Sequence, residues 1–378
     1  MSLDRASTAV EESAPAHVDS GHWHSAIRGP HRELLVPRGQ PRSGETVSGR
    51  RTAFGRESPV EKNPNNRTEG QDLQSHETIV CVCTRYDDPG RLIRCLASVC
   101  RQSEVPGALL VVVNRADVDI VEVRRHLATR LGEGPPVLTV IQEARVGIPY
   151  ARNAAVATTM RGEYEFVAFI DDDEVAPQHW LEQHLRTLSE SRSNVVTGPQ
   201  VPIIPAERCS SLVARAPQYS TVTHPTGSLR GAASTGNVVV HRRVFEGVTP
   251  WFDEELAPIG GSDYQFFRRA ATEGFIIRWN QRSEVYESYE PDQVSWRWLV
   301  ARHFRYGVLE GWTVRDGRTY ARAHLAGRGV LRIARGFGTM LRGIARRDSS
   351  SVPKGVESIS AGVGRIAGSL RRFPRTYH

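Results

Sequence analysis

The chain has 378 residues, of which 39% are hydrophobic and 24% charged, a composition typical of a soluble globular protein. No stretch approaches the ~18 uninterrupted apolar residues of a transmembrane helix, and the N-terminus lacks the basic-then-apolar pattern of a secretory signal. The five cysteines form no C-x-x-C pair, which argues against a zinc site and favours reduced thiols in a cytoplasmic protein.

Residues 1–76 are predicted to be disordered, because they are rich in Ser, Pro, Gly, Arg, Glu and Asn and cannot bury enough apolar surface to offset their conformational entropy. Residues 77–312 form the predicted folded domain, in which strands alternate with helices. This alternation predicts βαβ units and a parallel sheet, with ligands at the carboxyl ends of its strands. The predicted strands are 78–84, 108–113, 137–141, 166–170, 194–201, 235–241, 275–279 and 284–287. The predicted helices begin near residues 89, 118, 150, 180, 262 and 294.

The predicted strand 166–170 runs directly into four carboxylates, Asp171, Asp172, Asp173 and Glu174. Residues two apart in an extended chain point the same way, so Asp171 and Asp173 can aim at one point. Two converging carboxylates suit Mg²⁺ or Mn²⁺, which normally also takes substrate phosphates and water. A solvated acidic turn before a helix is the alternative.

Polar residues follow other predicted strands as well. Thr84 and Asn114 end the first two, so we expect them on the same rim as Asp171. His179 and His184 lie five apart on the helix that follows, not four, and are expected at the surface.

Five short blocks occur in one order across residues 77–310. The blocks are Val80–Arg85 with Leu92, Leu96, Ser98 and Gln102; Gly147 with Ala151–Asn153; Phe169–Asp173 with Pro177, Trp180 and Leu181; Thr235–Asn237; and Gly260–Asp263 with Phe266. Together they resemble the inverting, nucleotide-sugar-dependent glycosyltransferases of family 2, and most closely the bacterial members that build exopolysaccharides or other surface glycans. The resemblance implies an α/β GT-A fold, with a single, mainly parallel, twisted sheet flanked by helices.

The resemblance also implies roles for individual residues. Asp171 and Asp173 match the family's D-x-D motif, so Asp173 would ligate the metal on the sugar-nucleotide diphosphate and Asp171 would lie near the ribose or the ion. Thr84 and Arg85 lie where family members hold the nucleotide, and Arg152 matches an arginine near the nucleotide. For both arginines, a structural salt bridge is the alternative.

Asp263 matches the family's catalytic base, and an acid stabilising a helix N-terminus is the alternative. Three positions depart from the family pattern. Asn114 stands where an Asp usually bonds the base, which leaves the base open because Asn is both donor and acceptor. Ser262 replaces the Glu that usually precedes the catalytic Asp. Glu287 replaces a frequent His, as a further metal ligand or a surface acid.

The predicted function is therefore metal-dependent, inverting transfer of a sugar from a nucleoside-diphosphate sugar to a glycan or lipid-linked acceptor, in surface polysaccharide or glycoconjugate biosynthesis. A nucleotidyltransferase on a related sheet is one alternative, although residues 84–88 do not resemble its Gly-rich loop. A catalytically degenerate glycan-binding or scaffold protein is the other. Nucleotide-sugar turnover distinguishes the three.

Residues 313–378 form a predicted basic, partly helical tail. From residue 301 onward there are 16 Lys and Arg against 4 Asp and Glu, whereas the whole chain carries only +7. Apolar residues among these arginines favour peripheral contact with the inner face of the cell membrane, with a solvated tail as the alternative; several glycines weaken the helix prediction. No nucleic-acid recognition module is present, so no nucleic-acid partner is expected.

Overall fold

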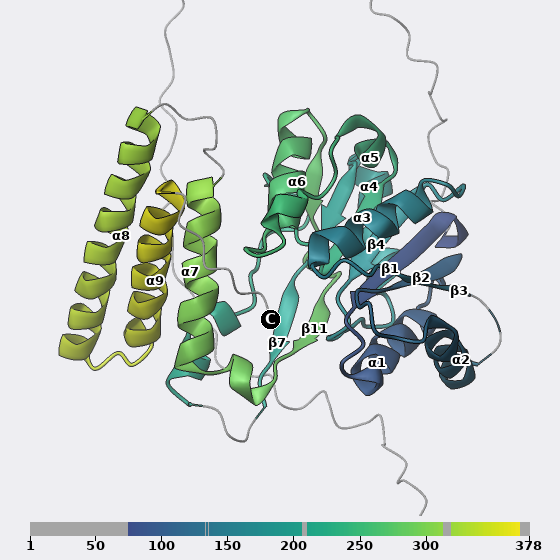
Figure 1. Ribbon diagram of the computed structural model, residues 1–378, viewed down its shortest axis with the longest axis horizontal. Helices are drawn as coiled ribbons and strands as arrows, with labels where there is room; N and C mark the ends of the chain where they lie inside the picture. The colour runs from purple at the N-terminus through teal and green to yellow at the C-terminus, as the bar shows by residue number, and fades with distance from the viewer. Residues whose placement is uncertain (1–74, 133, 135, 206–209, 313–318, 371–378) are drawn as a thin grey trace, which may run out of the picture. The chain divides into compact units, whose positions relative to one another are not determined.

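The computed structural model describes residues 75–132, 134, 136–205, 210–312 and 319–370 (Figure 1). The described chain begins with a 3₁₀ turn, Ser75–Glu77, directly before the first strand. The predicted disorder of residues 1–76 falls almost wholly outside the described residues. The domain boundaries near residues 76 and 312 stay predictions.

The framework consists of two sheets. An eight-stranded sheet has the order β3-β2-β1-β4-β9-β6-β10-β8, and a three-stranded sheet has the order β5-β11-β7. Strands β3, β2, β1 and β4 are parallel, whereas β9 runs antiparallel to both of its neighbours. The strands are β1 Thr78–Thr84, β2 Ala108–Val113, β3 Val137–Gln142, β4 Phe166–Ile170, β5 Glu174–Val175, β6 Val195–Thr197, β7 Gln200–Ile203, β8 Leu229–Arg230, β9 Asn237–His241, β10 Ile277–Trp279 and β11 Val285–Ser288.

The α/β class is confirmed, but two expectations about the strands are wrong. The framework is not a single sheet, since β5, β11 and β7 form one of their own. The predicted strand 194–201 is two strands, β6 and β7, which belong to different sheets. The break falls at Gly198 and Pro199: Pro199 has no N–H to donate to a ladder, and a Cβ on Gly198 would lie 2.5 Å from Ser283 Oγ.

Helices cover both faces of the large sheet. One core cluster joins the sheet to α1, α2 and α4, and a second joins its other face to α3, α5 and α6. Burial on both faces explains why β1, β2 and β4 read as continuous apolar runs. The helices are α1 Pro89–Cys100, α2 Ile120–Leu131, α3 Ile148–Thr159, α4 Trp180–Ser191, α5 Arg243–Gly247, α6 Ser262–Thr272, α7 Trp296–Trp312, α8 Thr319–Arg346 and α9 Ser351–Ser369, with 3₁₀ turns at Val213–Arg215, Pro217–Tyr219, Glu254–Leu256 and Pro291–Gln293.

Helices α7, α8 and α9 pack side by side, with α9 in contact with both others (Figure 1). The glycines of α8 do not break it, because several lie where α9 approaches closely. A Cβ on Gly336 would lie 2.8 Å from Gly355 O, and one on Gly329 would lie 2.8 Å from Gly362 O. Glycine spacing that weakens an isolated helix therefore permits a close helix pair here.

Helix α7 also packs against the sheet domain. Val308 and Leu309 form a small buried cluster with Leu256 and Ile259, ahead of α6. Among the described residues, no helix has both the length and the apolar content that a membrane crossing needs.

Candidate active site

The acidic turn lies at the end of β4, next to the end of β1. Thr84, the last residue of β1, donates a hydrogen bond of 2.5 Å from Oγ1 to Asp172 Oδ2. Because β4, β1 and β2 are parallel neighbours, their carboxyl ends share one edge of the sheet. The predicted proximity of Thr84 to the acidic turn is confirmed.

Asp172 holds the turn in place, a role that the D-x-D pattern does not assign to it. Besides Thr84, it accepts from Arg91 of α1, whose Nη2 lies 3.3 Å from Oδ1. Both side chains of this ion pair are largely buried. The carboxylate of Asp172 is thus bound by protein groups, and the carboxylates of Asp171 and Asp173 on either side of it are left for a ligand.

Asp171 and Asp173 lie in a strongly electronegative setting. Burial, together with the charges of Asp171, Asp172 and Glu287, raises the pKa of Asp173 to about 8. Burial also raises the pKa of Asp171, while the Arg152 guanidinium opposes that rise. Two crowded carboxylates are hard oxygen donors that suit Mg²⁺ or Mn²⁺.

No group of three or more His, Cys, Asp or Glu within the described residues is arranged to hold a metal ion. A divalent ion held by the two carboxylates would therefore complete its coordination with substrate phosphates and water, as is usual for Mg²⁺. The donor set fits the predicted ion on that condition.

Glu174 is fully buried and is hydrogen-bonded within the acidic turn. Its Oε2 accepts from the backbone N–H of Asp171 at 2.8 Å, and its Oε1 accepts from Gln200 Nε2 at 2.6 Å. Glu174 lies in β5, opposite Glu287 of β11. This second sheet therefore supports the acidic turn.

Arg152 lies beside the predicted base, and its charge reaches the acidic turn. It is buried on α3, and its Nη1 lies 3.9 Å from Asp263 Oδ2 and 3.4 Å from Ser262 Oγ. Its charge also acts on Asp171. The structure thus brings Arg152, Asp171 and Asp263 together from three separate stretches of sequence.

Asp263 stands in the first turn of α6, after Gly260 and Gly261, which both have positive φ. Its Oδ2 accepts long hydrogen bonds from the backbone N–H and the hydroxyl of Thr235, at 3.3 and 3.4 Å. Leu309 of α7 lies where a Cβ on Gly261 would project, so glycine is required there. The Thr235 and Gly260 blocks of the sequence therefore meet around one carboxylate.

Asn114 and Arg85 bond to neighbouring protein groups and not to the acidic turn. Asn114 is buried, donates to the backbone carbonyls of Glu143 and Arg145, and accepts from Gly147 N–H. It thereby shapes the loop ahead of α3. Arg85 is exposed and pairs with Asp87 at 3.2 Å. Their predicted contacts with the nucleotide stay predictions.

Glu287 is not a surface acid, because it lies half-buried beside the acidic turn. It accepts from Tyr289 Oη at 3.1 Å, and burial raises its pKa while Arg302 opposes the rise. Arg302 of α7 is stacked 4.8 Å from Trp298 and donates from Nε to Tyr306 Oη. Arg302 was not predicted as a site residue from the sequence. The signal was its four-residue spacing from both aromatic residues, which puts all three on one helix face.

A buried polar network supports the scaffold beneath the site, and the expectation that His184 lies at the surface is wrong. Asn237 Oδ1 accepts from Trp180 Nε1 and from His184 Nε2, each at 2.8 Å. Asn237 Nδ2 donates to the carbonyls of Pro199 and Ser283. Helix α4 is thereby tied to the break between β6 and β7. His179, in contrast, is exposed as expected.

Comparison with known proteins identifies relatives for most of this domain. Residues 78–247 match the family model of Glycosyl transferase family 2. The chain is 27% identical over 237 residues to the succinoglycan biosynthesis protein ExoM of Rhizobium meliloti (strain 1021), covering 61% of this chain and 72% of that protein.

Two solved structures are similar at low sequence identity. GalNAc-T7 with UDP, GalNAc and Mn²⁺ is 12% identical, with a TM-score of 0.48, covering 63% of this chain and 48% of that one. Residues 1–349 of TarS from S. aureus are 16% identical, with a TM-score of 0.44, covering 74% of this chain and 90% of that one. The chain spans about half the length of the GalNAc-T7 structure.

Proposed function

We propose that the chain is a family 2 glycosyltransferase with the GT-A fold and that it catalyses one specific reaction, because residues 78–247 match the model of that family. It transfers a sugar from a nucleoside-diphosphate sugar to a glycan or lipid-linked acceptor, with a divalent metal ion and inversion at the anomeric carbon. The setting is bacterial exopolysaccharide or surface-glycan synthesis, and the similarity to ExoM, a succinoglycan biosynthesis protein, supports it.

One observation carries the proposal: a single buried guanidinium lies beside both halves of the site. Arg152 is 3.9 Å from Asp263 and acts electrostatically on Asp171. A donor diphosphate at the acidic turn and an acceptor hydroxyl at Asp263 would thus meet around Arg152. Such an arrangement holds two substrates in one place, which is the main requirement of a transfer reaction.

The donor side is built from β1, β4 and α1. Asp171 and Asp173 would hold the divalent ion, whose chemistry is to stabilise the charge that develops on the leaving diphosphate. Thr84 and Arg91 fix the turn through Asp172, so both ligand carboxylates keep their position. Arg302 adds positive charge from the α7 side.

The acceptor side depends on Asp263. Its carboxylate takes the proton from the acceptor hydroxyl as that oxygen attacks the anomeric carbon, and the bond to the diphosphate oxygen breaks with its electron pair. Bonds from Thr235 keep the carboxylate oriented. One displacement from the face opposite the leaving group inverts the configuration, and base catalysis of this kind contributes roughly 10²–10⁴-fold.

Purified enzyme with Mn²⁺ tests the assignment on a panel of nucleotide sugars. Asp173→Asn should abolish donor hydrolysis and transfer, and Asp263→Asn should slow transfer by roughly 10²–10⁴-fold. Glu273→Gln, an exposed acid just past the end of the same α6, is the matched control. Unchanged transfer in both site variants would overturn the assignment.

Two further measurements separate metal use from inversion. Mn²⁺ binding in the presence of a nucleoside diphosphate, followed by electron paramagnetic resonance, should weaken in Asp173→Asn and not in Glu273→Gln. The proton NMR coupling of the product's anomeric proton should report a configuration opposite to the donor's. Retention of the donor configuration would contradict the single-displacement step.

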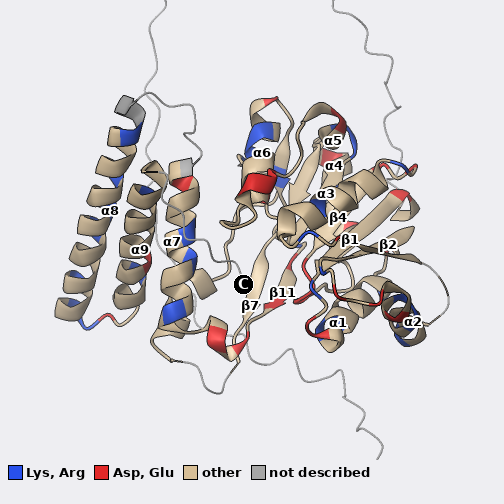
Figure 2. Ribbon diagram, in the orientation of Figure 1, with Lys and Arg blue, Asp and Glu red and all other residues tan. Residues whose placement is uncertain are grey.

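The proposal includes a location at the cytoplasmic face of the membrane, carried by the outer surface of α8. This helix contains many Arg and no Asp or Glu, and its basic positions run along its length (Figure 2). Its large apolar side chains away from α9 are between 49% and 68% exposed. They are Val330, Leu331, Phe337, Leu341 and Ile344. Apolar side chains flanked by arginines suit an anionic lipid surface.

Vesicle co-sedimentation tests this location. Phe337→Ser with Leu341→Ser should reduce binding to vesicles that contain phosphatidylglycerol, and binding of the unmodified protein should fall with added salt. Val121→Ser with Val137→Ser removes equally exposed apolar side chains elsewhere and is the matched control. If the α8 variant instead converts a lipid-free dimer into a monomer, the surface joins two copies and the membrane assignment is wrong.

A further inference from the structure

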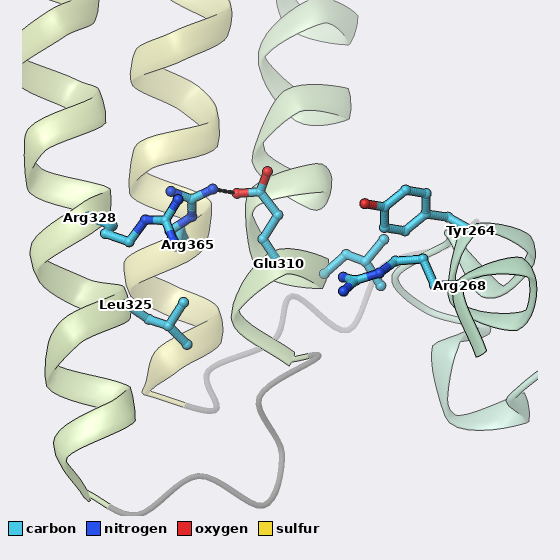
Figure 3. Close-up of a pocket in the computed structure, with 7 residues that line it drawn as sticks. Tyr264, Arg268, Glu310, Leu325, Arg328 and Arg365 are labelled. Carbon is cyan, nitrogen blue, oxygen red and sulfur yellow. Dashed lines mark hydrogen bonds and ion pairs between the residues drawn. The ribbon is translucent and has the colours of Figure 1, made fainter. Parts of the chain in front are cut away.

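A cavity of about 340 Å³ lies where α6 meets the three C-terminal helices (Figure 3). Tyr264 and Arg268 reach it from α6, Glu310 from α7, Arg328 from α8 and Arg365 from α9. Leu309 and Leu325 complete its wall. The cavity is thus built from segments far apart in the sequence, and the residues with hydrogen-bonding capacity face it from opposite sides.

Positive charge in this cavity exceeds negative charge. Glu310 accepts from Arg332 Nη1 at 3.1 Å and also from Arg365, so one carboxylate serves two guanidinium groups. Within the described part of the chain, Arg268 and Arg328 form no ion pair with a carboxylate, and Arg268 lies 5.7 Å from the Tyr264 ring. The cavity therefore has guanidinium groups left for a ligand that carries more than one negative charge.

The cavity is next to the base. Tyr264 follows Asp263 on α6, so the cavity adjoins the helix turn that presents the carboxylate. Leu309 packs on Gly261, which ties α7 to the same turn. A group bound in the cavity would lie on the acceptor side, against the first turn of α6.

We infer that this cavity binds a diphosphate group of the acceptor substrate, an inference that rests on the proposed function of the site. Guanidinium groups match phosphate oxygens in bidentate geometry, and several of them suit a multiply charged group better than a single carboxylate. Tyr264 supplies a hydroxyl, and the two leucines offer an apolar wall to the carbon chain of a lipid diphosphate. The diphosphate would anchor the acceptor while its sugar hydroxyl reaches Asp263.

Calorimetric titration of the full-length protein in EDTA tests the cavity without donor or metal. The probes are geranyl diphosphate, inorganic pyrophosphate and glucuronic acid. Both diphosphates should bind more tightly than glucuronic acid. Tighter binding of geranyl diphosphate than of pyrophosphate assigns a lipid source, and equal binding assigns recognition of the diphosphate alone. Tighter binding of glucuronic acid than of either diphosphate would overturn the inference.

Matched double variants distinguish the contribution of the cavity arginines to diphosphate binding from the contribution of the protein's net charge. Arg268→Ala with Arg328→Ala should weaken diphosphate binding at least tenfold, whereas Arg94→Ala with Arg130→Ala, on exposed faces of α1 and α2, should change it less than twofold. Equal loss in the two double variants would reduce the effect to net charge and overturn the inference. Arg268→Lys with Arg328→Lys keeps the charge and should recover only part of the affinity.

Measuring donor hydrolysis in the absence of acceptor distinguishes failure of this inference from failure of the proposed function. Hydrolysis should be the same in the unmodified protein and in the Arg268→Ala, Arg328→Ala variant. If the unmodified protein hydrolyses no donor, the proposed function fails, whatever the titrations show. If it hydrolyses a donor but the cavity variant binds diphosphate normally, only the present inference fails.

Discussion

The carboxyl edge of the sheet, which carries the acidic turn, and the helical unit α7–α9 differ in the sign of their charge. They also differ in what stabilises them, which is hydrogen bonding at the edge and close backbone packing in the helical unit. At the edge, buried and half-buried carboxylates outnumber the guanidinium groups that face them, and hydrogen bonds fix the side chains of Asp172 and Glu174. In the helical unit, arginines predominate and glycines bring the backbones of α8 and α9 close together. One region thus suits a cation with its bound phosphates, and the other suits an anion or an anionic surface.

This difference indicates which kind of change each region tolerates. A substitution at the edge acts through a lost hydrogen bond or an unbalanced charge, and its effect should appear in turnover or pH dependence. A substitution of a glycine between α8 and α9 acts through added volume, and its effect should appear in stability rather than in donor turnover.

Removing Arg152 should have the largest effect, because its guanidinium lies 3.9 Å from Asp263 and its charge acts on Asp171. Arg152→Gln is expected to lower kcat on the order of 10²–10³-fold, the loss typical of a group that stabilises charge in the transition state. Steady-state kinetics with a fixed donor measure this. Arg161→Ala, an exposed arginine just past α3, is the control.

A double-mutant cycle makes the Arg152 prediction specific. Arg152→Gln and Asp263→Asn should be strongly non-additive, since the two side chains are 3.9 Å apart. Additive effects would mean that Arg152 does not act through Asp263. Arg152 could then no longer be used as evidence that the carboxyl edge of the sheet depends on balanced charge.

His184 should make the stability of the sheet domain depend on pH. Its Nε2 donates to Asn237, and within the described residues its buried Nδ1 has no hydrogen-bond partner. Protonation would add an N–H there without an acceptor, and burial lowers the pKa of His184 from 6.5 to about 4. The unfolded chain binds this proton near pH 6.5, so the free energy of unfolding should fall by about 3 kcal/mol as the pH drops from 6.5 to 4.

Urea unfolding at several pH values checks the histidine. His184→Gln keeps a donor for Asn237 but cannot titrate, so its unfolding free energy should vary less over that pH range. His179→Gln, exposed at the start of the same helix, should keep the slope of the unmodified protein. An equal slope in all three proteins would assign the pH dependence to other groups.

Two glycines of α8 should respond in opposite directions to the same substitution. A Cβ on Gly336 would lie 2.7 Å from Ile359 Cγ1 and 2.8 Å from Gly355 O, whereas a Cβ on Gly338 meets no atom within 4 Å. Gly336→Ala should cost about 1–3 kcal/mol of unfolding free energy through overpacking. Gly338→Ala should add roughly 0.5–1 kcal/mol through helix propensity.

Thermal unfolding of the two variants measures this contrast. Donor hydrolysis should be unchanged in both, since neither glycine contacts the acidic turn. Stabilisation by both substitutions would show that α8 and α9 are not closely packed in solution.

The strands that sequence patterns predicted best are those that local composition determines. Strands β1, β2 and β4 are buried on both faces, so an unbroken apolar run defines each of them, and their predicted bounds match the structure. The division between β6 and β7 could not be read in the same way. It depends on the approach of Ser283 and Asn237 to Gly198 and Pro199, which are distant in sequence.

The candidate site shows the same limit. The acidic turn and Asp263 were predictable because their residue types stand next to a strand end and a helix start. The inward position of Glu287 was not, because it follows from the pairing of β11 with β5, a two-residue strand. The partners of Asp172 could not be predicted for a similar reason, since Thr84 and Arg91 come from the first βα unit of the fold.

The smallest effect is expected at Arg91, which supports the acidic turn without facing the ligand position. Arg91→Ala removes an ion pair in which the side chains are 22% and 15% exposed, but Thr84 still donates to Asp172. The loss should be about 1 kcal/mol of unfolding free energy, and an equal loss in donor binding would raise the KM for the donor about fivefold. Arg94→Ala, exposed on the same helix, should stay within about 0.5 kcal/mol. A drop in kcat with an unchanged KM in Arg91→Ala would contradict a positioning role for Arg91. It would indicate that Arg91 contacts the reacting groups directly. The hydrogen-bonded support of the turn would then be assigned to Thr84 alone.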